Sequence, residues 1–267
     1  MKNFLLIVVT LYLFIGLPVC SIEYQQTSDF YFRKIFTPAE NQLIKSFSND
    51  SHSNDILFFN FQKLFETKIY EMNNKDVDEI NEWYADDYDL RLVKIPKSYY
   101  VNHGILVSKA EGGQMFSLDN IYLKNKYGKY LSPEYNQWLD IKQKRNISNI
   151  FNMTAEEKYN EILYLENFIN KYPTFAAQQD VKHLLNYMID AYIGTGYENT
   201  INLFDDKNKL KKSYKKSYEN FIKKNKKSKY YSVVKLYYEK LKQYNFEKTT
   251  EFQEWRINIL GEIIKHS

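Results

Sequence analysis

The stretch from Thr154 to Ile193, TAEEKYNEILYLENFINKYPTFAAQQDVKHLLNYMIDAYI, decides the fold class of this chain. It opens on a capping box, in which Thr154 accepts a hydrogen bond from the backbone of Glu157 and the glutamate reaches back. Apolar residues then recur every three or four positions, which is typical of an amphipathic helix. Pro173 ends this helix, and a second amphipathic run follows up to a glycine. The stretch therefore predicts a helical hairpin.

A second hairpin of the same kind is expected 53 residues further along the chain. The sequence of Glu166–Ile169 recurs as Glu219–Ile222, and Val181-Lys182 recurs as Val234-Lys235. Helix, turn and helix align without a gap, so we expect repeated helical units that stack and bury a shared core. The alternative is a chance match in a composition that draws on few residue types.

The segment from Phe168 to Ile193 resembles the junction between tetratricopeptide-like units of exported bacterial proteins. The likeness rests on a helix that ends in Tyr172-Pro173 and on the small pair Ala176-Ala177 that opens the next helix. It departs from the family in its repeat length, since 53 residues exceed the 34 of the standard unit, and in its unmatched Trp and Gly positions. The resemblance implies a protein- or peptide-binding scaffold without catalysis.

The N-terminal portion predicts a mixture of helices and short strands. Thr37-Pro38-Ala39-Glu40 has the composition of a helix start, and the small polar residues of Ser46–Asp55 predict a loop. Two further helices are expected around Leu57–Ile69 and Val77–Tyr84. Between Leu90 and Leu118 alternating residues surround a Gly-Gly turn, which predicts a β-hairpin or a three-stranded piece.

The remaining helices are expected after Ser132-Pro133, along Leu210–Ile222, along Val233–Leu241 and after a capping box of Thr250 and Gln253. The fold class is therefore mainly α, with stacked C-terminal hairpins preceded by a smaller α+β portion. The expected boundaries are a signal peptide over 1–21, the α+β portion over 22–148 and the hairpin repeat over 149–267.

The first 21 residues have the three parts of a secretory signal. Lys2 is the basic residue, residues 4–17 are apolar but too few to span a bilayer, and cleavage is expected before Ile22. We therefore expect an exported protein, periplasmic or secreted. The alternatives are a buried N-terminal helix, an uncleaved anchor, and a lipoprotein signal in which Cys20 carries the lipid; for the cleaved protein this lipid would be the only attachment to a membrane.

Composition excludes several kinds of site. The only cysteine lies in the signal region, so thiolate metal sites, disulfides and cysteine nucleophiles are not expected. Only four of the 37 basic residues are arginines, which argues against a nucleic-acid partner. The 25 tyrosines suit either a carbohydrate surface or an aromatic core. No pattern of metal ligands or of cofactor-binding glycines occurs, so we expect no metal and no cofactor.

The strongest charge pattern is the segment 207–229, which carries 11 lysines and a single acid, Glu219. It predicts a binding face for an anionic surface, an envelope polymer or an acidic protein, and the alternative is an ordinary solvated helix face. The candidate binding residues are Lys211, Lys212, Lys215, Lys216, Lys223 and Lys224. An acidic cluster over 76–89 is expected to be helix surface.

Catalysis has only weak candidates in the sequence. His103 lies beside Gly104 in the expected hairpin, and Glu111 could orient it as a general base. We expect a non-catalytic binding or assembly scaffold in the cell envelope that takes a protein or envelope partner. The alternative is an envelope hydrolase that acts on a polymer through the segment 99–118.

Overall fold

A computed structural model places most of the chain and confirms the mainly helical class. The residues it describes are 37–73, 103–110, 113–144, 150, 152–194 and 203–260. Within them lie nine α-helices and one two-stranded antiparallel sheet. The expected signal peptide, the helix around 77–84 and the acidic cluster fall outside the described residues. No helix of the described part is long and apolar enough to cross a membrane.

The long helix α4 (Ser51–Asn73) organises the N-terminal portion and packs against α3 (Thr37–Ser46). Phe58, Phe61 and Phe65 form its buried face. The loop predicted over residues 46–55 is confined to residues 47–50, because the second half of that stretch is the start of α4. Asp50 caps the helix there by accepting from the backbone of His52 at 3.1 Å.

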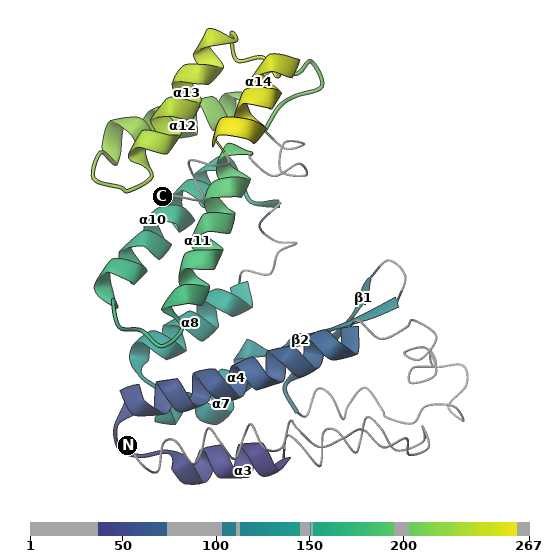
Figure 1. Ribbon diagram of the computed structural model, residues 1–267, viewed down its shortest axis with the longest axis vertical. Coiled ribbons are helices and arrows are strands. Elements are labelled where there is room, and N and C mark those ends of the chain that lie inside the picture. Colours follow the sequence, from purple (N-terminus) through teal and green to yellow (C-terminus); the bar gives the residue numbers. More distant parts are fainter. Residues whose placement is uncertain are drawn as a thin grey trace.

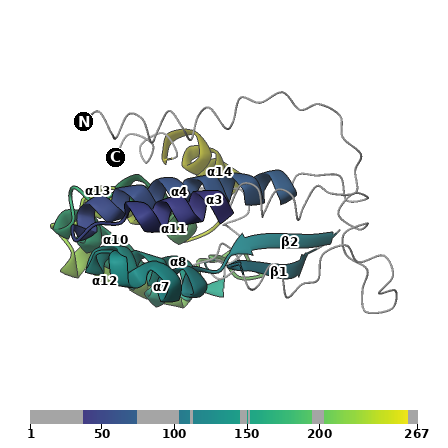
Figure 2. The same ribbon diagram turned by 90° about the horizontal axis from the view of Figure 1, so that it is seen from below.

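The expected β-hairpin is present as β1 (Ile105–Ala110) and β2 (Gly113–Leu118), paired from Ile105↔Leu118 to Ala110↔Gly113. It lies against the C-terminal end of α4, where the Asn73 amide pairs with both backbone groups of Phe116 at 2.8 and 2.9 Å. Figure 2 shows the hairpin extending beyond the helices on that side.

Helix α7 (Asn120–Tyr127) follows and was not expected from the sequence; its cap, Asp119, accepts from two backbone amides at 3.0 Å. The 3₁₀ turn η3 (Gly128–Tyr130) leads to α8 (Pro133–Lys144). The helix predicted after Ser132-Pro133 is therefore confirmed, and it contacts α7.

Aromatic contacts join the N-terminal portion to the first helical hairpin. Tyr135 of α8 meets Phe175 at 5.4 Å between ring centroids, and Phe175 meets Phe168 at the same distance. The buried side chains form one connected cluster from Leu43 to Phe252. The described residues on both sides of the expected 148/149 boundary thus share a core.

The C-terminal half consists of α10 (Ala155–Lys171), α11 (Gln178–Ile193), α12 (Lys212–Lys224) and α13 (Tyr231–Gln243). Helix α10 contacts both α11 and α12, and α12 contacts α13. The predicted capping box of α10 is confirmed in both directions, between Thr154 and Glu157. In Figure 1 these helices rise from α8 toward the end of the molecule opposite α3.

The turns of the two hairpins share their backbone hydrogen bonds at an offset of 53 residues. The Phe175 amide donates to Tyr172 at 3.2 Å, and the Ser228 amide donates to Asn225 at 3.0 Å. The next bonds in each turn, Gln178 to Phe175 and Tyr231 to Ser228, are 3.0 and 3.1 Å. The two turns therefore have the same pattern of backbone hydrogen bonds.

The final helix α14 (Thr250–Trp255) starts one residue earlier than predicted, because Thr249 is the residue whose side chain caps it. A π-helical segment, η5 (Arg256–Leu260), continues it. Arg256 is buried there and donates to the carbonyl of Gly194, the left-handed residue that ends α11. Burial lowers the pKa of Arg256, although it lies close to Tyr237 and Tyr218.

Candidate functional site

Four of the six lysines predicted to bind a partner form an open cationic surface on α12. Lys212, Lys216, Lys223 and Lys224 are exposed, whereas Tyr214, Tyr218 and Phe221 on the opposite side of the helix are buried. Lys226 and Lys227 in the turn after α12 are exposed as well. We call these six exposed lysines the α12 lysine face. Within the described part of the chain, none of the six forms an ion pair.

The other two predicted lysines serve the fold. Lys215 is half-buried, and its ammonium lies 4.3 Å from the centroid of the Phe246 ring, which is a cation–π contact. Lys211 is half-buried at the N-terminal boundary of α12, where its side chain makes no capping bond.

The single acid of the segment, Glu219, forms no ion pair with these lysines in the described residues. Its carboxylate accepts a hydrogen bond of 2.6 Å from the Tyr238 hydroxyl of α13. Burial and this bond to a carboxylate raise the pKa of Tyr238, which therefore stays protonated as the donor. Over residues 203–260, 16 Lys and Arg face seven Asp and Glu, so this end of the protein is strongly basic although the whole chain carries only +4.

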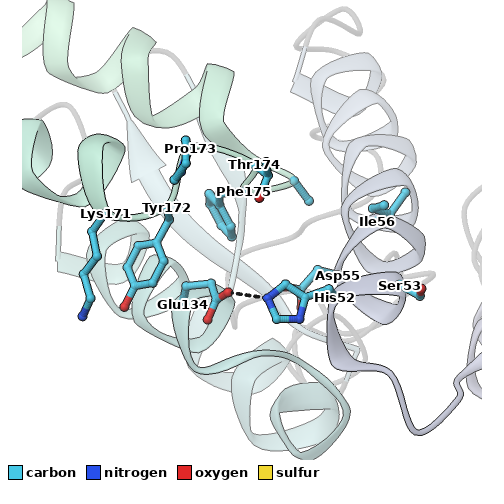
Figure 3. Close-up of a pocket in the computed structure, with 11 residues that line it drawn as sticks. His52, Ser53, Asp55, Ile56, Glu134, Lys171, Tyr172, Pro173, Thr174 and Phe175 are labelled. Carbon is cyan, nitrogen blue, oxygen red and sulfur yellow. Dashed lines mark ion pairs between the residues drawn. The ribbon is translucent and has the colours of Figure 1, made fainter.

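A cleft of about 460 Å³ lies on another part of the molecule, between the N-terminal ends of α4 and α8 and the turn after α10. Figure 3 shows His52 and Glu134 pointing toward each other, with Tyr172 and Phe175 close to Glu134. The His52 Nε2 atom lies 2.9 Å from Glu134 Oε1. The imidazole is 71% exposed and the carboxylate 13%, so the carboxylate is the fixed member of the pair.

The buried polar groups beside the cleft form hydrogen bonds that join α4 to the start of α8. Asp55 accepts from the backbone and from the hydroxyl of Ser132, at 2.9 and 2.5 Å, and Ser132 in turn caps α8 through the Tyr135 amide at 3.1 Å. Burial raises the pKa of Asp55 and outweighs the two bonds from Ser132, which lower it. Asp55 and Ser132 therefore join helices, and neither is placed as a free acid or nucleophile.

Of the two catalytic candidates from the sequence, His103 does not line this cleft. His103 is half-buried in the turn before β1, and Glu111 lies outside the described residues, as does Cys20. Among the described residues no three His, Cys, Asp or Glu side chains are grouped to hold a metal ion.

A buried lysine in the core was not expected from the sequence. Lys158 on α10 is 2% exposed, and its ammonium donates to the Tyr214 hydroxyl of α12 at 2.9 Å. Burial lowers its pKa to about 8, and the positive charge of Lys211 adds to this effect. Burial also raises the pKa of Tyr214 to about 12. No carboxylate in the described residues forms an ion pair with Lys158.

Comparisons with protein-family models, with curated protein sequences and with solved structures find no match to this chain. Its own geometry is therefore the basis for a functional proposal. That geometry offers a helix face of lysines that form no ion pair within the described residues, and a cleft with one histidine–carboxylate pair.

Sequence reasoning missed the cleft because the two members of its histidine–carboxylate pair are 82 positions apart and belong to different helices. His52 lies within the stretch that was predicted to be a loop, and Glu134 reads as an ordinary first-turn acid of α8. A usable signal was Asp50, a good capping residue directly before Ser51 and His52.

Proposed function

We propose that this protein is a non-catalytic binding or assembly scaffold, exported to the cell envelope, whose helical hairpins present a surface to a partner. The observation that carries the proposal is the matching pair of hairpin turns, at residues 172–178 and 225–231. Helical units that repeat in this way pack on their neighbours and leave extended faces for binding, as in tetratricopeptide-like proteins.

The state of the cleft supports a scaffold over an enzyme. A general base needs a titrating group within reach of a substrate and, for covalent chemistry, a nucleophile beside it. The hydroxyl of Ser132 donates to Asp55, and that of Ser53, the serine that lines the cleft, donates to Asp50 at 2.5 Å. Each of these hydroxyls donates to an aspartate, Asp55 or Asp50, and neither aspartate forms an ion pair with a histidine in the described residues.

An envelope hydrolase acting on a polymer is the second candidate function, and one observation favours it. The exposed imidazole of His52, held by the fixed carboxylate of Glu134, is an arrangement that a general base could use. This moves the candidate site away from the segment 99–118 and into the cleft.

Affinity capture from the native cell envelope separates the two proposals. The tagged protein is compared with a double variant, His52→Ala with Glu134→Gln, which removes the pair and leaves the Asp55–Ser132 joint intact. We expect both forms to recover the same protein partner in near-stoichiometric amounts. If neither form recovers a partner, or if the unmodified protein releases polymer fragments and the double variant does not, the scaffold proposal fails.

A further inference from the structure

We infer that the α12 lysine face binds a linear polyanion, a polymer with a phosphate, sulfate or carboxylate group on successive units. This inference rests on the proposed function and names a class of partner for it. The face consists of Lys212, Lys216 and Lys223 along one side of α12, with Lys224, Lys226 and Lys227 at its end. It runs for about 20 Å, the length of a helix of 13 residues.

The arrangement differs from an ordinary solvated helix surface. Ordinary helix surfaces carry charges of both signs. Four lysines elsewhere in this protein form ion pairs with a carboxylate: Lys68–Glu71, Lys124–Asp140, Lys209–Glu247 and Lys242–Glu239. Within α12 the only acid, Glu219, accepts a hydrogen bond from Tyr238, and no described lysine forms an ion pair with it. Six ammonium groups therefore remain available to an external anion.

The N-terminal end of α12 is electrostatically unfavourable for the lysines that lie there. Lys211 and Lys212 stand at the N-terminal end of α12, where the helix dipole is positive, and the first turn contains no acid. Lys212 and Lys216 are also like charges at a spacing of four residues, which disfavours the helix. An anionic chain lying along this face would relieve both conflicts. Charge complementarity therefore indicates an anionic chain as the ligand of this face.

The apolar residues distinguish a polymer from a membrane surface. Helices that bind membranes place large apolar side chains in the interface beside their lysines. The apolar residues Tyr214, Tyr218 and Phe221 of α12 are buried in the core, so none of the three can insert into lipid. Lysine, as a compact point charge, also suits successive anionic groups without demanding the planar geometry that arginine reads. The face is therefore built for electrostatic contact without insertion.

The test measures binding of the purified protein to long-chain polyphosphate over a range of salt concentrations, with anionic vesicles and neutral dextran as comparison ligands. One variant changes Lys212, Lys216, Lys223 and Lys227 to Gln. A matched control changes four ion-paired lysines, Lys68, Lys124, Lys209 and Lys242, to Gln, and so alters the net charge equally.

We expect the unmodified protein to bind polyphosphate with a salt slope on the order of −4, since six charges on a single-stranded polyanion each contribute about −0.7. The variant of the face should lose at least about tenfold in affinity at low salt and most of this slope, whereas the control stays within about twofold. Equal losses in both variants would mean that net charge alone is responsible and would overturn the inference.

Two further outcomes also overturn it: binding to anionic vesicles without binding to polyphosphate, and no binding to either. Capture of the protein partner is measured with the same two variants. If the partner is still recovered while polyphosphate binding is absent, the scaffold proposal stands and the polyanion inference falls. If neither the protein partner nor polyphosphate is bound, the scaffold proposal and the polyanion inference both fail.

Discussion

Replacing Lys158 by methionine should stabilise the protein, although it removes a hydrogen bond. Lys158 is 2% exposed, and the only hydrogen bond of its ammonium group in the described part of the chain goes to Tyr214. Its pKa in the folded protein is about 8, against an ordinary value of 10.5. Keeping the ammonium charged in this site at neutral pH therefore costs free energy.

The size of the effect follows from the pKa difference. One pKa unit corresponds to about 1.4 kcal/mol, so the depression is equivalent to about 3 kcal/mol of unfavourable free energy at pH 7. Methionine removes this cost and fills much of the same volume, but Tyr214 loses its donor, which costs about 1 kcal/mol. We expect Lys158→Met to raise the free energy of unfolding by about 2 kcal/mol and the Tm by about 4–8 °C.

The depressed pKa of Lys158 also determines how the free energy of unfolding depends on pH. Between pH 8 and 10.5 the unfolded chain binds more protons at this lysine than the folded protein does, so the stability of the unmodified protein rises with pH across that window. The methionine variant lacks this rise. The difference in stability between the two forms should therefore be largest below pH 8 and decline by pH 10.

Urea unfolding followed by circular dichroism at pH 7 and pH 10 measures this difference. Lys182→Met, at an exposed position of α11, is the matched control and should change the free energy of unfolding by less than about 0.5 kcal/mol. The reasoning is refuted if Lys158→Met destabilises the protein at pH 7, or if its effect is the same at both pH values.

Three other outcomes follow from the sequence and the structure. Thr154→Ala removes the capping box of α10 and should lower the free energy of unfolding by about 1 kcal/mol in the same urea assay; no change would mean that the cap is replaced by solvent. Gly194→Ala should cost about 1–2 kcal/mol, because φ is +70° and the new Cβ would lie 2.9 Å from a Leu203 methyl carbon; an unchanged Tm would contradict this. Mass spectrometry of the mature protein should find Ile22 at the N-terminus, and a lipidated Cys20 would show the alternative processing.

The helices were predictable because their signals are local. The stripe Val233, Val234, Tyr237 and Leu241 follows the helical period and is buried throughout in α13. A capping box needs only two residues at a fixed spacing, and that of Thr154 and Glu157 formed as expected. Errors arose where one composition serves two structures, since Ser, Asn and Asp favour both loops and helix starts.

The buried charges could not be predicted, because tertiary packing determines them. Lys158 lies among the polar positions of a helix start, and only the approach of α12 with Tyr214 covers it. Arg256 likewise has no feature in the sequence that indicates burial, yet it is buried against the carbonyl of Gly194, 62 positions away. A sequence indicates which residues are charged but not which of them the fold will exclude from water.

The α12 lysine face implies that this protein gives up stability for binding, and the two four-lysine variants test that directly. Lys212 and Lys216 repel each other and Lys212 opposes the helix dipole, whereas the dipole favours Lys223 in the last turn, so replacing the four lysines by Gln should raise the free energy of unfolding by a net of about 0.5 kcal/mol. The control variant breaks four surface ion pairs and should be unchanged or less stable, by up to about 1 kcal/mol for each pair. Thermal unfolding at low salt shows the contrast best, because salt screens both effects. If the variant of the face is less stable than the unmodified protein, its lysines support the fold, and the case for a surface kept for a partner is lost.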